Sequence, residues 1–256
     1  MKKGKLFIFL VVVSFIILVQ PGVFTTVSQA LFPRSFSEQV TKKQVLSSDK
    51  DINKSLAKKK FEGKQVIEVN NNIPTLNTDS PDVKNKNHWK KFSNLDILNR
   101  VGSAEALISF ESLPTKKRED ISKVIPTGWK NKRITFNGKK DFLYNRCHLI
   151  AFELSGENAN AKNLFTGTRA LNANDADRSQ SMVYYEDMIK NYVKTTHHRV
   201  LYQVTPIFYG VDLVAKGVRM QAKSIEDDQI SFDIFIFNVQ PGYQINYLDG
   251  TSEREN

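Results

Sequence analysis

The sequence predicts an α+β fold in which one amphipathic helix accompanies an antiparallel sheet. Between about Ser179 and Thr195, apolar residues recur at spacings of three and four, as in a helix with one buried face. After residue 199, β-branched and aromatic residues alternate with other side chains, as in strands. The alternating segments are 200–209, 218–224 and 230–238, and they are separated by Gly210, Gly217 and an acidic turn at 226–228.

The first 30 residues have the layout of an export signal. Three lysines precede the uncharged run Leu6–Val19, and Ser28-Gln29-Ala30 then offers a cleavage site with small residues. The uncharged run has 14 residues, fewer than the roughly 20 that span a bilayer. We therefore predict a cleaved signal peptide at 1–30 and a secreted protein without stable membrane association. An uncleaved membrane anchor is the alternative, and both place the remaining chain outside the cytoplasm.

The predicted mature chain is basic and contains one cysteine. The whole sequence has a formal net charge of +10, and removal of the three leader lysines leaves +7. Such a charge favours a polyanionic partner, although many secreted proteins are basic for solubility alone. A single cysteine excludes an intramolecular disulfide, so an ordinary hydrophobic core must supply the stability.

Residues 31–60 predict a polar basic linker or arm, followed by one folded domain over 61–256. Lys42-Lys43 and Lys58-Lys59-Lys60 lie among polar residues without a sustained apolar period. This segment is interpreted either as a spacer or as an arm that follows nucleic-acid backbone. The domain is expected to open with a strand at 65–69 and to continue through irregular chain to a basic cluster that includes Arg133.

The stretch 144–172 concentrates the side chains that carry chemistry. A histidine such as His148 can accept a proton near neutral pH, and the side-chain oxygen of Asn172 can bind a hard cation. Arg146 and Arg169 can hold phosphate. A strand over 141–148 is expected to carry the histidine. Cys147 is expected to be a small buried residue, because neighbours on a strand point to opposite faces.

This stretch resembles the DNA/RNA non-specific endonucleases of the ββα-metal class, above all the streptodornase-type secreted deoxyribonucleases and the DNA-entry nucleases. The family's Asp-Arg-Gly-His box corresponds to Asn145-Arg146-Cys147-His148, and Asn163, residues 166–169 and Asn172 follow it. Glu186 lies fourteen residues after Asn172, at the spacing of a family glutamate. The resemblance covers roughly 61–247 and implies a ββα-metal nuclease core with a flanking antiparallel sheet.

The resemblance also implies roles for these residues. His148 becomes the general base, Asn172 the one direct protein ligand of magnesium, or alternatively of manganese, and Glu186 a residue that binds a water on the ion. Asn163 is expected to order the loop at the substrate site. Phosphate contacts are expected from three arginines: Arg133, Arg146 and Arg169. Because Asn145 stands where the family usually has aspartate, another group must orient the imidazole of His148.

The implied activity is sequence-non-specific hydrolysis of DNA, with RNA as an open alternative, to products with 5′-phosphate ends. A catalytically impaired nucleic-acid or host-surface binding protein on the same scaffold is the alternative, because Asn145 and Cys147 depart from the family box. Motifs of zinc proteases, nucleotide-binding proteins and serine hydrolases are absent from the sequence. The oligomeric state is left open.

Overall fold

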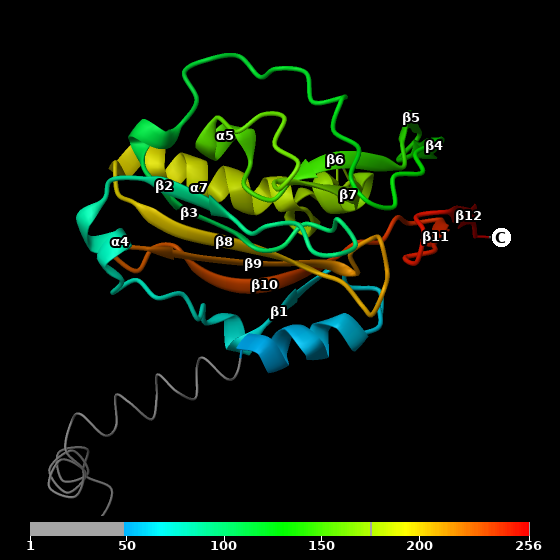
Figure 1. Cartoon of the computed structure of the whole chain (residues 1–256), viewed down its shortest axis with the longest axis horizontal. Coiled ribbons are helices and arrows are strands. Elements are labelled where there is room, and N and C mark those ends of the chain that lie inside the picture. Colours follow the sequence, from blue (N-terminus) through cyan, green and yellow to red (C-terminus); the bar gives the residue numbers. More distant parts are fainter. Residues whose placement is uncertain (1–48, 175, 256) are drawn as a thin grey trace, which may run out of the picture. The chain divides into compact units, whose positions relative to one another are not determined.

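The computed structural model describes residues 49–174 and 176–255, so the predicted signal peptide at 1–30 lies outside the described residues. One compact unit begins at Asp51 and holds the elements described below (Figure 1). Among the described residues, no helix has the length and apolarity needed to cross a membrane.

A six-stranded antiparallel sheet forms the centre of this unit, with the strand order β1-β10-β9-β8-β3-β2. Its strands are β1 (Val66–Glu68), β2 (Trp89–Phe92), β3 (Ala104–Ile108), β8 (Val200–Ile207), β9 (Gly217–Ser224) and β10 (Ser231–Phe237). The three alternating segments of the sequence are therefore neighbours, as predicted. In their pairing, Val204 lies opposite Met220 and Ile234 opposite the same residue on the other side.

Three two-stranded pieces and several short helices complete the unit. The two-stranded pieces are β4 (Arg133–Phe136) with β5 (Lys139–Phe142), β6 (Tyr144–His148) with β7 (Leu164–Thr168), and β11 (Tyr243–Ile245) with β12 (Ser252–Arg254). The α-helices are α4 (Pro81–Asn85), α5 (Phe152–Ser155), α6 (Arg169–Asn172) and α7 (Met182–Thr196), and the 3-10 turns are η1 (Asn70–Asn72), η2 (Phe110–Ser112) and η3 (Arg178–Gln180).

The fold is the predicted α+β arrangement, with the ββα unit made by β6, β7 and the helices after them. The expected strand at 141–148 is in fact two strands, because β5 ends at Phe142 and β6 begins at Tyr144. The expected helix at 179–195 begins at Met182 instead, after a short 3-10 turn. The first difference arises at a bend at residue 143 and the second at the turn η3, and apolar periodicity marks neither.

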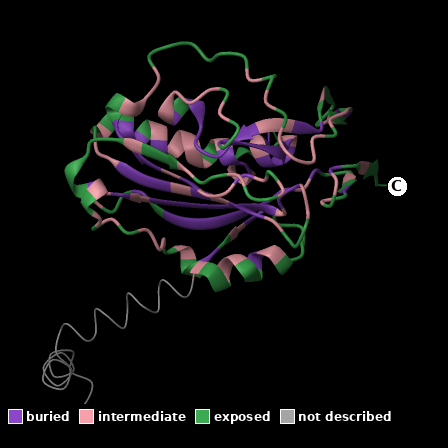
Figure 2. Cartoon of the chain, in the orientation of Figure 1, coloured by how far each residue is buried: buried purple, intermediate pink, exposed green. Residues whose placement is uncertain are grey.

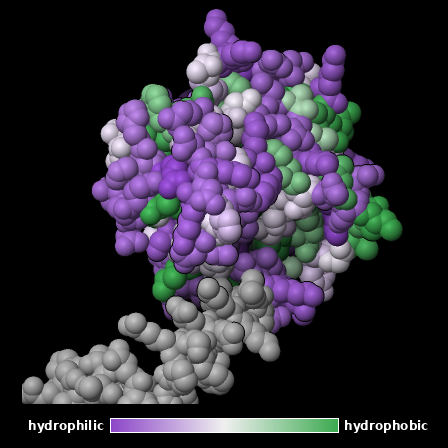
Figure 3. Space-filling model, turned by 60° about the vertical axis from the view of Figure 1, so that its left-hand side comes forward, coloured by the Kyte–Doolittle hydropathy of each residue, from purple (hydrophilic) through white to green (hydrophobic). Residues whose placement is uncertain are grey.

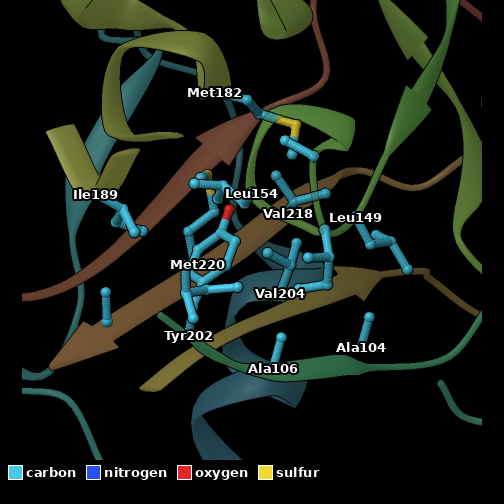
Figure 4. Close-up of a cluster of buried hydrophobic side chains, with 14 of the residues drawn as sticks. Ala104, Ala106, Leu149, Leu154, Met182, Ile189, Tyr202, Val204, Val218 and Met220 are labelled. Atoms are coloured by element: carbon cyan, nitrogen blue, oxygen red, sulfur yellow. The ribbon is translucent and has the colours of Figure 1, made fainter. Parts of the chain in front are cut away.

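The main core lies between α7 and one face of the sheet. Tyr202, Val218 and Met220 from the sheet meet Met182 and Ile189 from α7, and all five are almost completely buried (Figure 4). The period-two pattern of the strands and the period of three and four in α7 thus supply the two sides of one core. Strands β3, β8, β9 and β10 are largely buried, whereas the edge strands β1 and β2 and the elements around the sheet are partly exposed (Figure 2).

The other face of the sheet carries a helix that the sequence did not predict. Residues 49–58 are helical, and Leu56 packs with Phe235 and Phe237 of β10. On the same face, the fully buried Arg219 donates to Asp233 at 2.7 and 2.5 Å. This helix lies in the last part of the segment interpreted as a linker at 31–60, and the boundary at 61 stays a prediction. The helix has too few apolar residues to show the apolar periodicity by which a helix is predicted from sequence.

Candidate active site

The β6–β7 hairpin presents the box residues at one edge of the main core. Alternation on β6 buries Cys147, and burial raises the pKa of its thiol, which keeps the thiol protonated. Gly167 lies against it on β7, where an added Cβ would stand 2.4 Å from the Cys147 sulfur. The cysteine at the family's glycine position is therefore accommodated by a glycine on the partner strand. Its role as a small buried residue is confirmed.

His148, the last residue of β6, is only 7% exposed and is held by a backbone carbonyl. Its Nε2 lies 3.0 Å from the carbonyl oxygen of Asn158. Because a carbonyl can only accept, Nε2 carries the proton and Nδ1 carries the lone pair. The group that orients the imidazole is thus the main chain of Asn158, not a carboxylate at position 145.

The unprotonated nitrogen of His148, Nδ1, faces an arginine. Nη2 of Arg118 lies 3.3 Å from Nδ1. Burial, and secondarily the charge of Arg118, lowers the pKa of His148 to about 4, although the contact with Asn158 opposes this shift. The imidazole is therefore neutral at neutral pH, which is the protonation state that a base requires.

Asn172 ends α6 and is oriented by Asn145. The amide nitrogen of Asn172 donates to Oδ1 of Asn145 at 3.2 Å. This contact occupies the nitrogen end of the amide and leaves Oδ1 of Asn172 as its available acceptor. Oxygen of this kind is what Mg²⁺ and Ca²⁺ prefer in proteins. Asn145 therefore positions the candidate metal ligand.

Glu186 projects from α7 into the same pocket. Burial, and secondarily the neighbouring charge of Asp187, raises the pKa of Glu186 to about 8. The described residues contain no group of three or more His, Cys, Asp or Glu side chains that could enclose a metal ion. The amide oxygen of Asn172 and the carboxyl group of Glu186 are few ligands. They suit an ion that keeps most of its bound water, as Mg²⁺ usually does in proteins.

These side chains line one pocket of about 620 Å³. His148, Asn172 and Glu186 share it with Arg118 and Arg146. The guanidinium of Arg146 is fixed twice: its Nε donates to the carbonyl oxygen of Val124 at 2.6 Å, and its carbon lies 4.3 Å from the centre of the Trp129 ring. The pocket thus combines a neutral base, an oxygen donor for a cation and two arginine charges.

Comparison with known proteins identifies the family. Residues 81–226, more than half of the chain, match the family model described as DNA/RNA non-specific endonuclease. The chain belongs to this family. It is accordingly an endonuclease, and its substrate is nucleic acid.

Two solved nucleases are similar in fold and sequence. NucA from Streptococcus agalactiae, with magnesium bound, is 25% identical with a TM-score of 0.66, and the alignment covers 76% of this chain and 89% of NucA. Sda1 nuclease, with bound zinc, is 26% identical with a TM-score of 0.59, over 65% of this chain and 81% of Sda1. Both of these solved nucleases hold a divalent metal ion.

Three residues expected at the substrate site lie outside the pocket lining of the nuclease. Asn163 is fully buried, and its amide bonds the main-chain nitrogen and oxygen of Ile150 at 2.8 and 3.0 Å. It can therefore order the loop after His148, and its place at the substrate site stays a prediction. Arg169 donates to Asp141 at 2.7 Å. Arg133 is exposed on β4, with its guanidinium carbon 5.3 Å from the ring of Phe142, which lines the pocket.

Arg118 is the pocket residue of this nuclease that the sequence did not reveal. It lies 30 positions before His148, in the irregular segment between η2 and β4. The only local signal is the run Lys116-Lys117-Arg118, which by itself is typical of a solvated loop. In the folded chain, Arg118 is the residue of this run that contacts His148.

Proposed function

We propose that this nuclease is secreted and cleaves DNA without sequence preference in a magnesium-dependent reaction, with His148 as the general base and 5′-phosphate ends as products. The observation that carries the proposal is the shared pocket of His148 and Asn172, in which Nδ1 of His148 is an acceptor that faces Arg118 and Oδ1 of Asn172 is an acceptor for a cation. RNA is a second substrate to be tested. Secretion is supported by the leader-like pattern of residues 1–30.

His148 would take a proton from the attacking water through Nδ1. The carbonyl of Asn158 holds the proton on Nε2, so the lone pair points into the pocket in one fixed orientation. The positive charge that forms on the imidazole is stabilised by this same hydrogen bond. A bound phosphate also favours the protonated imidazole, which offsets the burial that lowers its pKa in the free protein.

Asn172 and Glu186 would hold the divalent cation, Asn172 through Oδ1 and Glu186 through a water. When bound, the ion supplies positive charge for the phosphoryl oxygens and the leaving oxygen. Neutral Asn172 leaves the full charge of the ion available. Asn145 contributes by keeping the amide nitrogen of Asn172 turned away from the ion.

Arg118 and Arg146 would bind the phosphate beside the base. Arg118 lies 3.3 Å from Nδ1, which is close to the position that a water attacking the phosphorus must occupy. Substrate binding would therefore draw its guanidinium from the imidazole toward the phosphate. Arginine is suited to this role because its planar guanidinium matches phosphate oxygens in pairs.

Digestion of supercoiled plasmid by the purified protein tests the proposal. We expect complete degradation with magnesium, none with a chelator, and recovery when magnesium or manganese is added in excess. End-labelling of the products should find 5′-phosphate, and Asn172→Ala should lose cleavage while still folding by circular dichroism. Tight DNA binding without cleavage in either ion would instead support a binding protein on this scaffold. N-terminal sequencing of protein from the culture medium should find Leu31, whereas the intact chain in membranes would indicate an anchor.

A further inference from the structure

A second concave site lies away from the catalytic pocket, near the end of the helix at 49–58. It has a volume of about 530 Å³, and we call it the lysine groove. None of its residues lines the catalytic pocket. Its defining side chains are Lys58, Lys59, Lys60, Phe61, Tyr209 and Lys216.

The charge of the lysine groove is largely uncompensated. Lys58, Lys59 and Lys60 are exposed, and none of them forms an ion pair with another described residue. Elsewhere on the surface, lysines such as Lys84 pair with carboxylates, here Asp79 at 3.0 Å. Three adjacent cations without partners attract an anionic ligand, because no internal ion pair must be broken to bind it.

Aromatic rings stand beside these lysines. Tyr209 is 51% exposed and Phe61 is 45% exposed. The ring of Phe61 is held edge-on against Phe237, with the centroids 5.6 Å apart, so it keeps its place while part of it faces solvent. Lys216 lies 3.8 Å from the centre of the Tyr247 ring, where it pairs with Asp212 at 3.4 Å.

A groove that combines cations with exposed rings fits one kind of polyanion best. Single-stranded nucleic acid presents phosphates to lysines and base faces to aromatic rings, and sites for it commonly combine both. An anionic membrane also attracts lysines, but a flat lipid surface does not fill a concave groove. The face that Figure 3 shows is mostly hydrophilic, with hydrophobic residues in smaller groups.

We propose that the lysine groove is an exosite that binds a single-stranded stretch of the polynucleotide substrate while another part of the same polymer occupies the catalytic pocket. Phosphates would contact Lys58, Lys59 and Lys60, and a base would stack on Tyr209. Trp129 and Tyr144 of the catalytic pocket belong to the same aromatic cluster as Tyr247 of the groove, so packed side chains connect the two sites. The inference rests on the proposed nuclease activity.

The decisive experiment compares long and short substrates. The variant carries Lys58→Ala, Lys59→Ala and Lys60→Ala, and its matched control removes the same charge at Lys84, Lys86 and Lys223, which are paired with carboxylates. We expect the groove variant to raise KM for long denatured DNA and leave kcat unchanged. Cleavage of a tetranucleotide should equal that of wild type, because a substrate of this length occupies only the catalytic pocket.

The salt dependence gives an independent readout. Loss of three phosphate contacts should reduce the slope of log affinity against log salt by about 2 for single strands. Tyr209→Ala should weaken binding of a single-stranded oligonucleotide by roughly tenfold, the order expected for one stacked base. Equal effects of the groove variant and its charge-matched control, or equal losses on long and short substrates, would overturn the exosite.

Binding and cleavage are measured separately so that the two proposals can fail independently. Fluorescence anisotropy with a 30-nucleotide single strand in chelator requires no catalysis, and wild type should bind more tightly than the groove variant. If no substrate is cleaved but this difference persists, the nuclease mechanism fails and the binding site stands. If the groove variant loses binding to phosphatidylserine vesicles while its DNA kinetics and its oligonucleotide affinity match wild type, the groove is a membrane site and the exosite is refuted.

Discussion

The catalytic pocket and the lysine groove are both hollows with positive charge, yet they are built in opposite ways. In the catalytic pocket, the chemical side chains are oriented by specific partners: His148 by the carbonyl of Asn158, Asn172 by Asn145, and Arg146 by Val124 and Trp129. In the lysine groove, Lys58 to Lys60 are exposed and lack ion-pair partners among the described residues.

This difference follows from what each site must do. Bond cleavage requires a lone pair, an oxygen donor and a phosphate within a few tenths of an ångström of one geometry, so each group needs a neighbour that fixes it. Binding of a flexible polyanion requires charge at about the right place and tolerates mobile side chains. Substitutions should therefore cost most where a side chain is fixed and least where it is free.

The largest effect is expected from removal of the base. His148→Ala should reduce the initial rate of plasmid cleavage by roughly 100- to 10,000-fold, with DNA affinity retained, because only proton transfer is lost. Added imidazole should restore part of the rate. His198→Ala is the matched control, since this histidine pairs with Asp227 outside the pocket and should leave the rate unchanged. A folded His148→Ala protein with near wild-type activity would remove the proposed base.

A smaller loss is expected from the arginine beside the base. Arg118→Ala should lower kcat by about 100- to 1,000-fold, the range for one donor to transition-state charge. It should also raise the pKa of His148, because the nearby positive charge that disfavours the imidazolium is gone. The acid limb of kcat/KM should then move to higher pH. Lys117→Ala is the neighbouring control, and an equal loss there would mean that Arg118 acts only through the charge of its loop.

The residue that orients the metal ligand should matter less again. Asn145→Ala frees the amide of Asn172 to rotate, and activity should fall by roughly 10- to 100-fold, as for other groups that position a ligand. Asn145→Asp keeps an oxygen acceptor and should retain most activity. Initial rates measured against magnesium concentration should then reach half of their maximum at a higher magnesium concentration than in wild type. An unchanged magnesium dependence in Asn145→Ala would refute the positioning role.

The smallest effect is a pH dependence of metal affinity. The pKa of Glu186 is raised to about 8 in the metal-free protein, so a bound cation must displace its proton at neutral pH. Affinity for magnesium should therefore rise with pH and level off above about 8. Glu186→Gln should bind magnesium more weakly and with no such rise. Isothermal titration calorimetry between pH 6 and 9 measures both, and parallel curves for the two proteins would assign the titration to another group.

The raised pKa also has a consequence for folding. Because protonated Glu186 is favoured in the folded metal-free state, its contribution to stability is present below its ordinary pKa of 4.5 and is lost as pH rises toward 8. His148 acts in the opposite direction: its pKa is lowered from 6.5 to about 4, so stability is lost as pH falls through this interval. Thermal unfolding in chelator should show both trends, and Glu186→Gln should abolish the first.

The sequence by itself predicted the class of fold and four residues of the catalytic pocket. Periodicity is a local property, so it revealed α7 and the strands β8 to β10 without knowledge of their partners. The resemblance to a family pattern likewise predicted Arg146, His148, Asn172 and Glu186, which the fold brings into one pocket.

Only the tertiary structure decided how those residues are oriented. The group that fixes His148 is a backbone carbonyl, which every residue possesses and no sequence pattern marks. Arg118 contacts the imidazole from a loop position 30 residues earlier in the chain, and the amide of Asn163 is turned inward to Ile150. The helix at 49–58 is polar along most of its length and is held by a few contacts on the far face of the sheet. Such contacts depend on which distant segments meet, and that is fixed by the packing of the whole core.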